Sequence, residues 1–325
     1  MRVLLDVSAV PERPVGAGVY TMNLARHLSE RDDVDLELLA RSADGPRWTR
    51  TAPAAAVHAL LPNLRALRLA AEQVVRPSGE ARIDVWHGPH YTMPWYRSAP
   101  PGVVTVHDLT FFDHPEWHER TKVLFFRRAI RRSADRARVL VTPSAVTSRR
   151  LHEIVGDVAD VTTIPHGVDH HRFRPDDDEP ADLAVLRGIG VQPPYIAFAG
   201  TLEPRKDLPC LVDAFARVAA QRPHLRLVLA GGDGWGSKAV QTAVENSGVT
   251  TRILRPGYVD DGVLPALYRR AAAVAYPSLE EGFGLPRSGV SRLCGADRHH
   301  TGHGHGRGRR RRRVARGHSQ PPRNR

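Results

Sequence analysis

The sequence is poor in cysteine and has no long apolar run. Only two cysteines, Cys210 and Cys294, occur in 325 residues, too few for a disulfide framework or a thiolate metal site. The apolar start of the chain is interrupted by Arg2 and Asp6, and no segment approaches the roughly 18 to 20 apolar residues that cross a bilayer. We expect a cytoplasmic protein, with peripheral contact at the inner face of a membrane left open because arginines recur over residues 127–136.

The body of the chain also lacks an excess of either charge. The formal charge of the whole sequence is +12, which alone would suggest a nucleic-acid partner. Residues 287–325, however, contain twelve Arg, no Lys and one acid, Asp297, whereas residues 1–286 contain 35 basic and 34 acidic side chains. The basic character belongs to the C-terminal segment, so we expect no dedicated nucleic-acid partner.

Short β-branched segments alternate with helical patterns, which is typical of parallel sheets covered by helices. In the first half the expected strands are residues 2–7, 35–39, 83–86, 103–106, 139–142 and 161–164, and the expected helices are 19–30, 64–75, 119–133 and 145–155. In the second half the expected strands are residues 195–199, 225–230, 253–255 and 272–276, and the expected helices are 208–221, 237–246 and 262–270. The sequence therefore predicts an α/β protein with two doubly wound, Rossmann-like domains.

A proline-rich, acidic segment separates these two halves. We predict an N-terminal domain over residues 1–168, a linker over 169–194 with a short helix at 181–187, and a partial C-terminal domain over 195–286. The second domain is incomplete because a doubly wound domain that has reached its fourth strand normally continues. Residues 287–325 have five consecutive arginines and few apolar side chains, so we expect this Arg/Gly/His-rich tail to be disordered.

Two segments of the first half place functional groups where strands end. Gly16 and Gly18 lie in a turn before a helix, where backbone N–H groups suit an anionic or hydroxyl-rich ligand. This turn lacks the third glycine and the distal acid of a nicotinamide-binding turn. His107 and Asp108 follow the strand at 103–106, and an imidazole beside a carboxylate at a strand end favours a catalytic role.

The second half has three comparable segments. Arg205 and Lys206 follow a strand and precede a helix, where two cations are well placed to hold a departing diphosphate. Gly231 and Gly232 end the next strand and allow a ligand close to the backbone. After the last strand, Glu281 is positioned to accept hydrogen bonds from hydroxyl groups. Gly282 and Gly284 are positioned to bring backbone N–H groups close to the same ligand.

Six stretches together resemble the retaining glycosyltransferases of family 4, which share the two-domain GT-B fold. They are the Arg-Pro-x-Gly-x-Gly-x-Tyr turn at 13–20, HDLTFFDHPEW at 107–117, VTPSAVTSRRL at 141–151, IPHGVD at 164–169, GTLEPRKD at 200–207 and PSLEEGFGLP at 277–286. The resemblance implies transfer of a hexose from a nucleotide-sugar held mainly by the second domain to a glycan or lipid-linked acceptor held mainly by the first. It implies chemistry in the cleft between the domains, with no metal; a GDP-mannose donor is the specific expectation.

The resemblance also implies roles for individual residues. Arg205 and Lys206 would stabilise the departing nucleoside diphosphate, and Glu281 would hold sugar hydroxyls. Gly282, Phe283, Gly284 and Leu285 would supply backbone donors. His107 would lie near the reacting carbon, and the glycine turn at 16–18 would face the donor phosphates or the acceptor. Retention is expected by substitution on the same face of the sugar, with the leaving phosphate helping to deprotonate the acceptor.

The sequence departs from the family pattern after Pro286. The family places a second acid eight residues after the first, and counting from Glu281 leads to Gly289. Because the composition changes at the same point, we hypothesise a change of reading frame near codon 287. The coding DNA tests this directly: another frame should encode an acid near position 289 and further βα units. Without them we expect impaired activity, since donor binding and domain closure both depend on that region.

Two other functions remain open. A sugar-nucleotide epimerase or a phosphorylase would share the GT-B architecture, and product analysis separates these from a transferase. A non-catalytic fragment or a basic-tailed binding protein is the second alternative. Nucleic-acid retention that depends on residues 287–325, in the absence of donor binding, would favour it.

Overall fold

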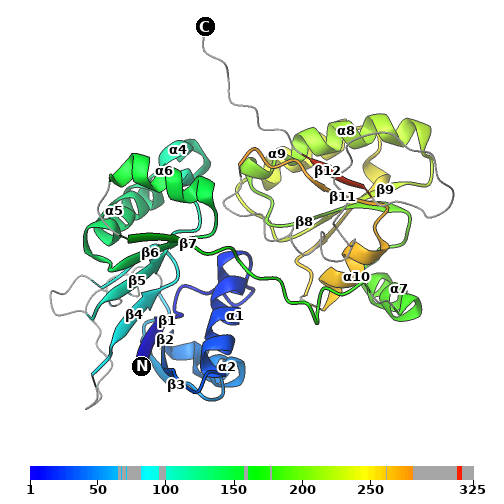
Figure 1. The fold of residues 1–325 in the computed structure, drawn as a ribbon. Helices are drawn as coiled ribbons and strands as arrows, with labels where there is room; N and C mark the ends of the chain where they lie inside the picture. Colours follow the sequence, from blue (N-terminus) through cyan, green and yellow to red (C-terminus); the bar gives the residue numbers. More distant parts are fainter. Residues whose placement is uncertain are drawn as a thin grey trace, which may run out of the picture. The chain divides into compact units, whose positions relative to one another are not determined.

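The computed structural model describes residues 1–64, 82–94, 100–156, 160–175, 178–260, 262–280 and 313–316, together with Leu67 and Ala71. The chain forms two compact units, Met1–His166 and Gly167–Arg325. Each unit is built on its own parallel sheet with helices packed against it (Figure 1). The predicted α/β class with two Rossmann-like units is confirmed.

The first unit contains a seven-stranded sheet in the order β3-β2-β1-β4-β5-β6-β7. Its strands are β1 (Arg2–Asp6), β2 (Asp35–Arg41), β3 (Ala56–Leu61), β4 (Val85–Gly88), β5 (Gly102–Thr105), β6 (Val139–Thr142) and β7 (Asp160–Thr163). Its described α-helices are α1 (Ala17–Ser29), α2 (Gly45–Thr51), α4 (Thr110–Asp113), α5 (Arg120–Arg136) and α6 (Ala145–Val155). The strand order reverses beside β1, where doubly wound sheets bind ligands at the carboxyl ends of the strands.

Alternate residues of β1 explain why both faces of this sheet are covered. Val3 and Leu5 pack into a cluster with α1 and α2, including the fully buried Trp48. Leu4 joins a cluster on Trp86 instead. Because successive side chains of a strand point to opposite faces, an uninterrupted apolar run such as this one fits a strand that is buried on both sides.

The second unit contains a five-stranded sheet in the order β10-β9-β8-β11-β12. Its strands are β8 (Tyr195–Ala199), β9 (Arg226–Ala230), β10 (Ile253–Gly257), β11 (Ala273–Tyr276) and β12 (Arg313–Arg316). Its α-helices are α7 (Glu179–Gly188), α8 (Leu208–Gln221), α9 (Ser237–Asn246) and α10 (Val263–Arg270). One core cluster joins α7 and α10 to the sheet and a second joins α8 and α9 to it.

The structure agrees with most of the expected elements and adds β3 and α2, which the sequence analysis missed. Strand β3 is half exposed along its length and pairs with β2 in a register that shifts between Leu39 and Arg41. Its alanine-rich sequence has no alternation, so only the pairing with β2 identifies it as a strand. The helix expected at residues 64–75 lies largely outside the described residues.

Two segments differ from the expected domain plan. The expected linker, 169–194, contains α7, whose Leu186 is fully buried in the core of the second unit. Within the tail, 287–325, the structure describes only β12, which pairs in parallel with β11. We expected these four residues to be disordered, but the edge of β11 offers backbone groups that an extended chain can bond. The rest of the tail lies outside the described residues.

Candidate functional site

Four ring-bearing side chains of the first unit gather near the point where its strand order reverses. His87 is in β4, His107 follows β5, His166 follows β7, and Tyr20 is on α1. The strands are parallel and therefore bring their carboxyl ends to one edge of the sheet. The predicted location of His107 at the carboxyl end of a central strand is what the structure has.

His107 is buried and bonded to the main chain. Its Nε2 lies 2.7 Å from the carbonyl oxygen of Pro89. Because a carbonyl only accepts, Nε2 carries the proton, and in the neutral ring Nδ1 is an acceptor. Burial lowers the pKa of His107, although the bond to Pro89 and the charge of Asp108 oppose that shift. A neutral ring is thus favoured, suited to accepting a hydrogen bond from a hydroxyl group.

Asp108 does not form the imidazole–carboxylate pair that its position suggested. Its Oδ1 accepts a hydrogen bond from the Thr110 hydroxyl at 3.0 Å, and Thr110 also contacts the His118 ring at 3.0 Å. The carboxylate therefore orders the turn into α4. Its influence on His107 is electrostatic only.

Aromatic and imidazole rings enclose His107. Tyr20 contacts it edge to face with ring centroids 5.1 Å apart, and His166 lies 5.4 Å from it and 4.6 Å from Tyr20. The Thr105 hydroxyl lies 3.0 Å from His87 Nε2 and 3.2 Å from the Tyr20 hydroxyl. No role was predicted for Tyr20, His87 or His166, although Tyr20 lies on the helix after the glycine turn and the two histidines lie at or just after strand ends.

The histidines of this cluster are held neutral. Burial and, to a smaller extent, the nearby His107 lower the pKa of His87 and of His166 to about 4. Within the described residues, no three His, Cys, Asp or Glu side chains are arranged to hold a metal ion. The cluster therefore offers uncharged rings and hydroxyl groups, a lining suited to a hydroxyl-rich molecule.

We predict that acid destabilises the first unit through these rings. The ordinary pKa of 6.5 falls to about 4 in the folded chain for both His87 and His166. Above pH 6.5 both states are neutral; as the pH falls from there toward 4, only the unfolded chain takes up protons, so unfolding becomes easier. Urea unfolding at a series of pH values should show a free energy that decreases over this window.

A double variant, His87→Gln with His166→Gln, should flatten that dependence. The exposed His224 in the second unit provides the control, since His224→Gln should leave the slope unchanged. An unchanged slope in the double variant, once its fold is confirmed by circular dichroism, would contradict the prediction.

The glycine turn of the first unit leads directly into α1. Gly16 has φ 44° and is the residue that caps the helix, and its carbonyl accepts the Tyr20 amide at 3.0 Å. A Cβ on Gly16 would meet no atom within 4 Å. A Cβ on Gly18 would lie 3.1 Å from Pro14 Cβ. Gly16 is thus favoured by its conformation and borders open space, whereas at Gly18 a side chain would be in tight contact with Pro14.

In the second unit the strand order reverses between β8 and β11, and the loops after these two strands are bonded together. Leu279 N donates to Arg205 O at 2.9 Å, and Arg205 Nη1 donates to Glu280 O at 3.3 Å. Arg205 Nε also donates to Glu203 Oε2 at 2.8 Å. Arg205 is therefore adjacent to the residue that precedes Glu281.

Lys206 follows Arg205 and is only 6% exposed. The next residue, Asp207, adopts a left-handed conformation with φ 47° and begins α8. This short turn places two cations in sequence beside the N-terminus of a helix, whose backbone dipole also attracts anions. The arrangement is suited to a diphosphate.

The glycine turn after β9 packs on the turn after β8. A Cβ on Gly231 would lie 2.0 Å from Gly200 O, whereas a Cβ on Gly232 would meet no atom within 4 Å. Gly200 N donates to Ala230 O, Gly231 N to Gly257 O and Leu202 N to Gly232 O, at 2.9, 2.7 and 3.1 Å. Gly231 therefore serves internal packing, and Gly232 is the position that leaves room for a ligand.

The expected acid and its neighbours lie outside the described residues. These are Glu281, Gly282, Phe283, Gly284 and Leu285. Their assignment stays a prediction from the sequence.

Comparisons with known proteins agree with this arrangement. The Glycosyltransferase Family 4 profile matches residues 14–172, and the Glycosyl transferases group 1 profile matches residues 187–287. The second match ends where the sequence pattern changes. O-antigen chain mannosyltransferase B of Escherichia coli is 30% identical over 205 residues, which cover 62% of this chain and 53% of that protein.

The D-inositol 3-phosphate glycosyltransferase of Mycobacterium tuberculosis strain F11 is 29% identical over 307 residues, covering 83% of this chain and 61% of that protein. The chain thus spans between half and two thirds of the length of these two relatives.

Solved structures have the same fold. HepE of Anabaena, in complex with UDP and glucose, matches with a TM-score of 0.65 at 19% identity over 90% of this chain and 78% of its own. Sucrose-phosphate synthase from Thermosynechococcus elongatus matches with a TM-score of 0.67 at 16% identity over 90% of this chain and 79% of its own. With one glycosyltransferase profile on each unit, the chain belongs to the family 4 and group 1 glycosyltransferases of the GT-B fold.

Proposed function

We propose that the protein transfers a hexose, with retention of anomeric configuration, from a nucleotide-sugar to a glycan or lipid-linked acceptor. The observation that carries this proposal is the bonding of the Arg205 loop to the Leu279–Glu280 segment where the order of the second sheet reverses. That bonding holds the turn with Arg205 and Lys206 against the residues that directly precede Glu281. We assign donor binding to the second unit and acceptor binding to the first.

In the proposed reaction the bond between the anomeric carbon and the diphosphate oxygen breaks, and the diphosphate leaves with the electron pair. Arg205 and Lys206 stabilise the charge that grows on it, in place of a metal ion. The acceptor hydroxyl forms its bond on the same face of the sugar and gives its proton to the leaving phosphate. His107 Nδ1 accepts a hydrogen bond from a sugar hydroxyl near the reacting carbon, which orients the sugar.

The proposed donor is GDP-mannose. A relative that is 30% identical is named a mannosyltransferase, which supports the sugar. HepE was solved with UDP, with UDP-glucose, and with UDP and glucose, so UDP-glucose is the necessary comparison.

A donor-consumption assay with the full chain tests the proposal. We expect release of GDP from GDP-mannose, faster than release of UDP from UDP-glucose, with an unchanged rate in EDTA. Anomer analysis of the product by NMR should show retention. Release of nucleoside diphosphate from neither donor, together with no binding of either nucleotide, would overturn the function.

We propose in addition that α5 brings the enzyme to anionic membranes, where lipid-linked acceptors lie. Among the described helices none is long and apolar enough to cross a bilayer. On α5, Leu124 is 72% exposed, and the exposed Arg128 and Arg131 follow at helical spacing on the same face. Such a combination of an apolar residue with arginines favours the surface of an anionic bilayer.

Vesicle co-sedimentation tests the role of α5. Arg128→Glu with Arg131→Glu should abolish retention on vesicles containing phosphatidylserine. Because the tail also carries arginines, the matched control is a second double variant with the same change of charge, Arg217→Glu with Arg222→Glu. Both residues are exposed, and this variant should leave retention unchanged. Equal loss in both variants would show a general charge effect and contradict the proposal.

A further inference from the structure

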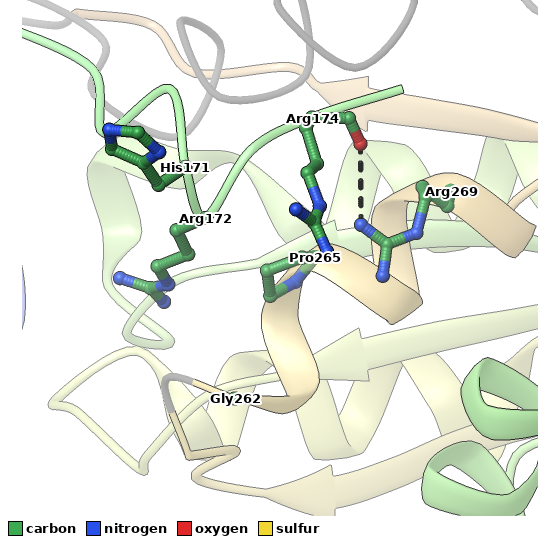
Figure 2. Close-up of a pocket in the computed structure, with 6 residues that line it drawn as sticks. All are labelled: His171, Arg172, Arg174, Gly262, Pro265 and Arg269. Carbon is green, nitrogen blue, oxygen red and sulfur yellow. Dashed lines mark hydrogen bonds between the residues drawn. The ribbon is translucent and has the colours of Figure 1, made fainter. Parts of the chain in front are cut away.

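The second unit contains a basic pocket that the proposed reaction does not use. It has a volume of about 340 Å³ and is lined by His171, Arg172, Arg174, Gly262, Pro265 and Arg269 (Figure 2). None of these residues belongs to the loops that carry Arg205 or Gly231. The lining comes instead from the segment before α7 and from α10 with the residue that caps it.

The segment and the helix are fastened to each other. Arg269 Nη1 donates to the carbonyl oxygen of Arg174 at 3.4 Å, and the Arg174 side chain extends toward α10 beside Arg269 (Figure 2). The carboxylate of Asp169 accepts the backbone amides of His171 and Arg172 at 3.0 and 3.1 Å. These bonds fix the backbone that presents the arginines.

The charge of the pocket is one-sided. Its described lining contains three arginines, one histidine and no acid. Within the described part of the chain, two carboxylates are bonded to lining residues. Asp169 accepts the two backbone amides named above, and the buried Asp182 binds Arg269 through Nη2 at 2.6 Å and Nε at 2.9 Å and also binds Arg270 Nε at 2.9 Å.

The two other arginines that line the pocket are Arg172 and Arg174. The Arg172 guanidinium lies 4.8 Å from the centre of the Phe173 ring, which orients it, and Arg174 is exposed. The first turn of α10 contains no acid, and Gly262 gives the helix no side-chain cap, but Asp260 and Asp261 directly precede Gly262 in the sequence. The guanidinium groups are therefore the feature that favours an anion at this place.

We propose that this pocket binds a small phosphorylated molecule at a site separate from the donor site. A volume of about 340 Å³ is at the lower end of the range for small-molecule sites, which fits a sugar phosphate or a similar phosphate monoester. Two guanidinium groups match the oxygen atoms of a phosphate monoester better than a single point charge does. The pocket is then a second phosphate-binding site in the same unit. Its ligand does not take part in the transfer reaction.

Calorimetric titration of the full chain tests the proposal, with glycerol 3-phosphate and glucose 6-phosphate as probes at moderate salt. The five consecutive arginines at 309–313 also attract phosphate, so the informative quantity is the change between variants. Arg174→Ala and Arg172→Ala should each weaken the pocket's binding by about tenfold, the scale of one charge-assisted hydrogen bond. Arg217→Ala, on the helix α8, is the matched control and should leave the affinity unchanged.

The outcomes separate the possible sites. Loss in the Arg172 and Arg174 variants, with full binding in Arg205→Ala, supports the pocket. Loss in Arg205→Ala alone assigns the phosphate to the donor site and overturns the proposal, as does equal loss in Arg217→Ala. Binding to phosphatidate vesicles without binding to either soluble probe also overturns it. Arg174→Lys should retain part of the affinity. Such partial rescue would show that Arg174→Ala binds the probe weakly because it lacks the charge, and not because it is unfolded.

Discussion

Gly231→Ala should unfold the second unit under conditions where the Gly232→Ala variant stays folded. A Cβ on Gly231 would lie 2.0 Å from the carbonyl oxygen of Gly200 and 2.6 Å from its carbonyl carbon. Both of these atoms belong to backbone that is itself bonded to β9, so the clash cannot be relieved by rotating a side chain. Gly231 also has φ 150°, which residues with a side chain rarely adopt. We expect a loss of more than about 4 kcal/mol in the free energy of unfolding.

Gly232→Ala provides an internal control for that experiment. A Cβ on Gly232 meets no atom within 4 Å, so its free energy of unfolding should change by no more than about 0.5 kcal/mol. Urea unfolding followed by circular dichroism measures both variants. Two variants of equal stability would show that Gly231 and Gly200 are not in the close contact described above.

Arg205→Ala should weaken the binding of nucleoside diphosphates by roughly 30- to 150-fold, equivalent to about 2–3 kcal/mol for a hydrogen-bonded charge. The guanidinium is placed by Glu203 and by the carbonyl oxygen of Glu280, so its position in the free protein is already set. Titration calorimetry with GDP and with UDP gives the two affinities. Arg205→Lys should recover only part of the loss, because an ammonium keeps the charge without the planar pair of donors.

Two further variants make the Arg205 result specific. Lys206→Met retains most of the volume of a buried side chain and should weaken nucleotide binding in the same direction. Arg217→Ala should leave it unchanged. If Arg205→Ala and Lys206→Met both bind nucleotide as tightly as the unaltered protein does, the cationic pair has no role in the donor site.

The fold was largely predictable because its segments are locally consistent. Strand β8 and the helices α6, α8 and α9 have the predicted bounds, and each is a run whose hydrophobic period matches its secondary structure. The strand β3 was missed because its identity depends on pairing with β2. Likewise β12 depends on the edge of β11, and no local pattern in an arginine-rich segment indicates such pairing.

The position of His107 in the fold was predictable, but its bonds were not. His107 follows a central strand, as expected, yet its hydrogen-bond partner is a backbone carbonyl at Pro89, 18 residues earlier in the chain. The adjacent residues His107 and Asp108 have different partners, the carbonyl oxygen of Pro89 and the Thr110 hydroxyl, and the sequence does not indicate either pairing. The grouping of His87 with His107 follows from the order β4-β5 in the sheet, which local sequence does not specify.

The basic pocket could not be predicted from the sequence either. Arg172 and Arg269 are almost 100 residues apart in the sequence, and each one alone would pass for an ordinary surface arginine. Their common position arises because the segment before α7 is fastened to α10. Charge clusters assembled in this way become visible only once the chain is folded.

The ladder of amide bonds from Gly200 to Ala230, from Gly231 to Gly257 and from Leu202 to Gly232 continues the pairing of β8, β9 and β10 past the ends of the strands. The turns that follow are therefore already ordered before any small molecule arrives. A ligand that binds to these turns does not have to order them, so little conformational entropy is lost on binding and more of the interaction energy contributes to affinity. The rim of this sheet is in that sense preorganised by its own backbone.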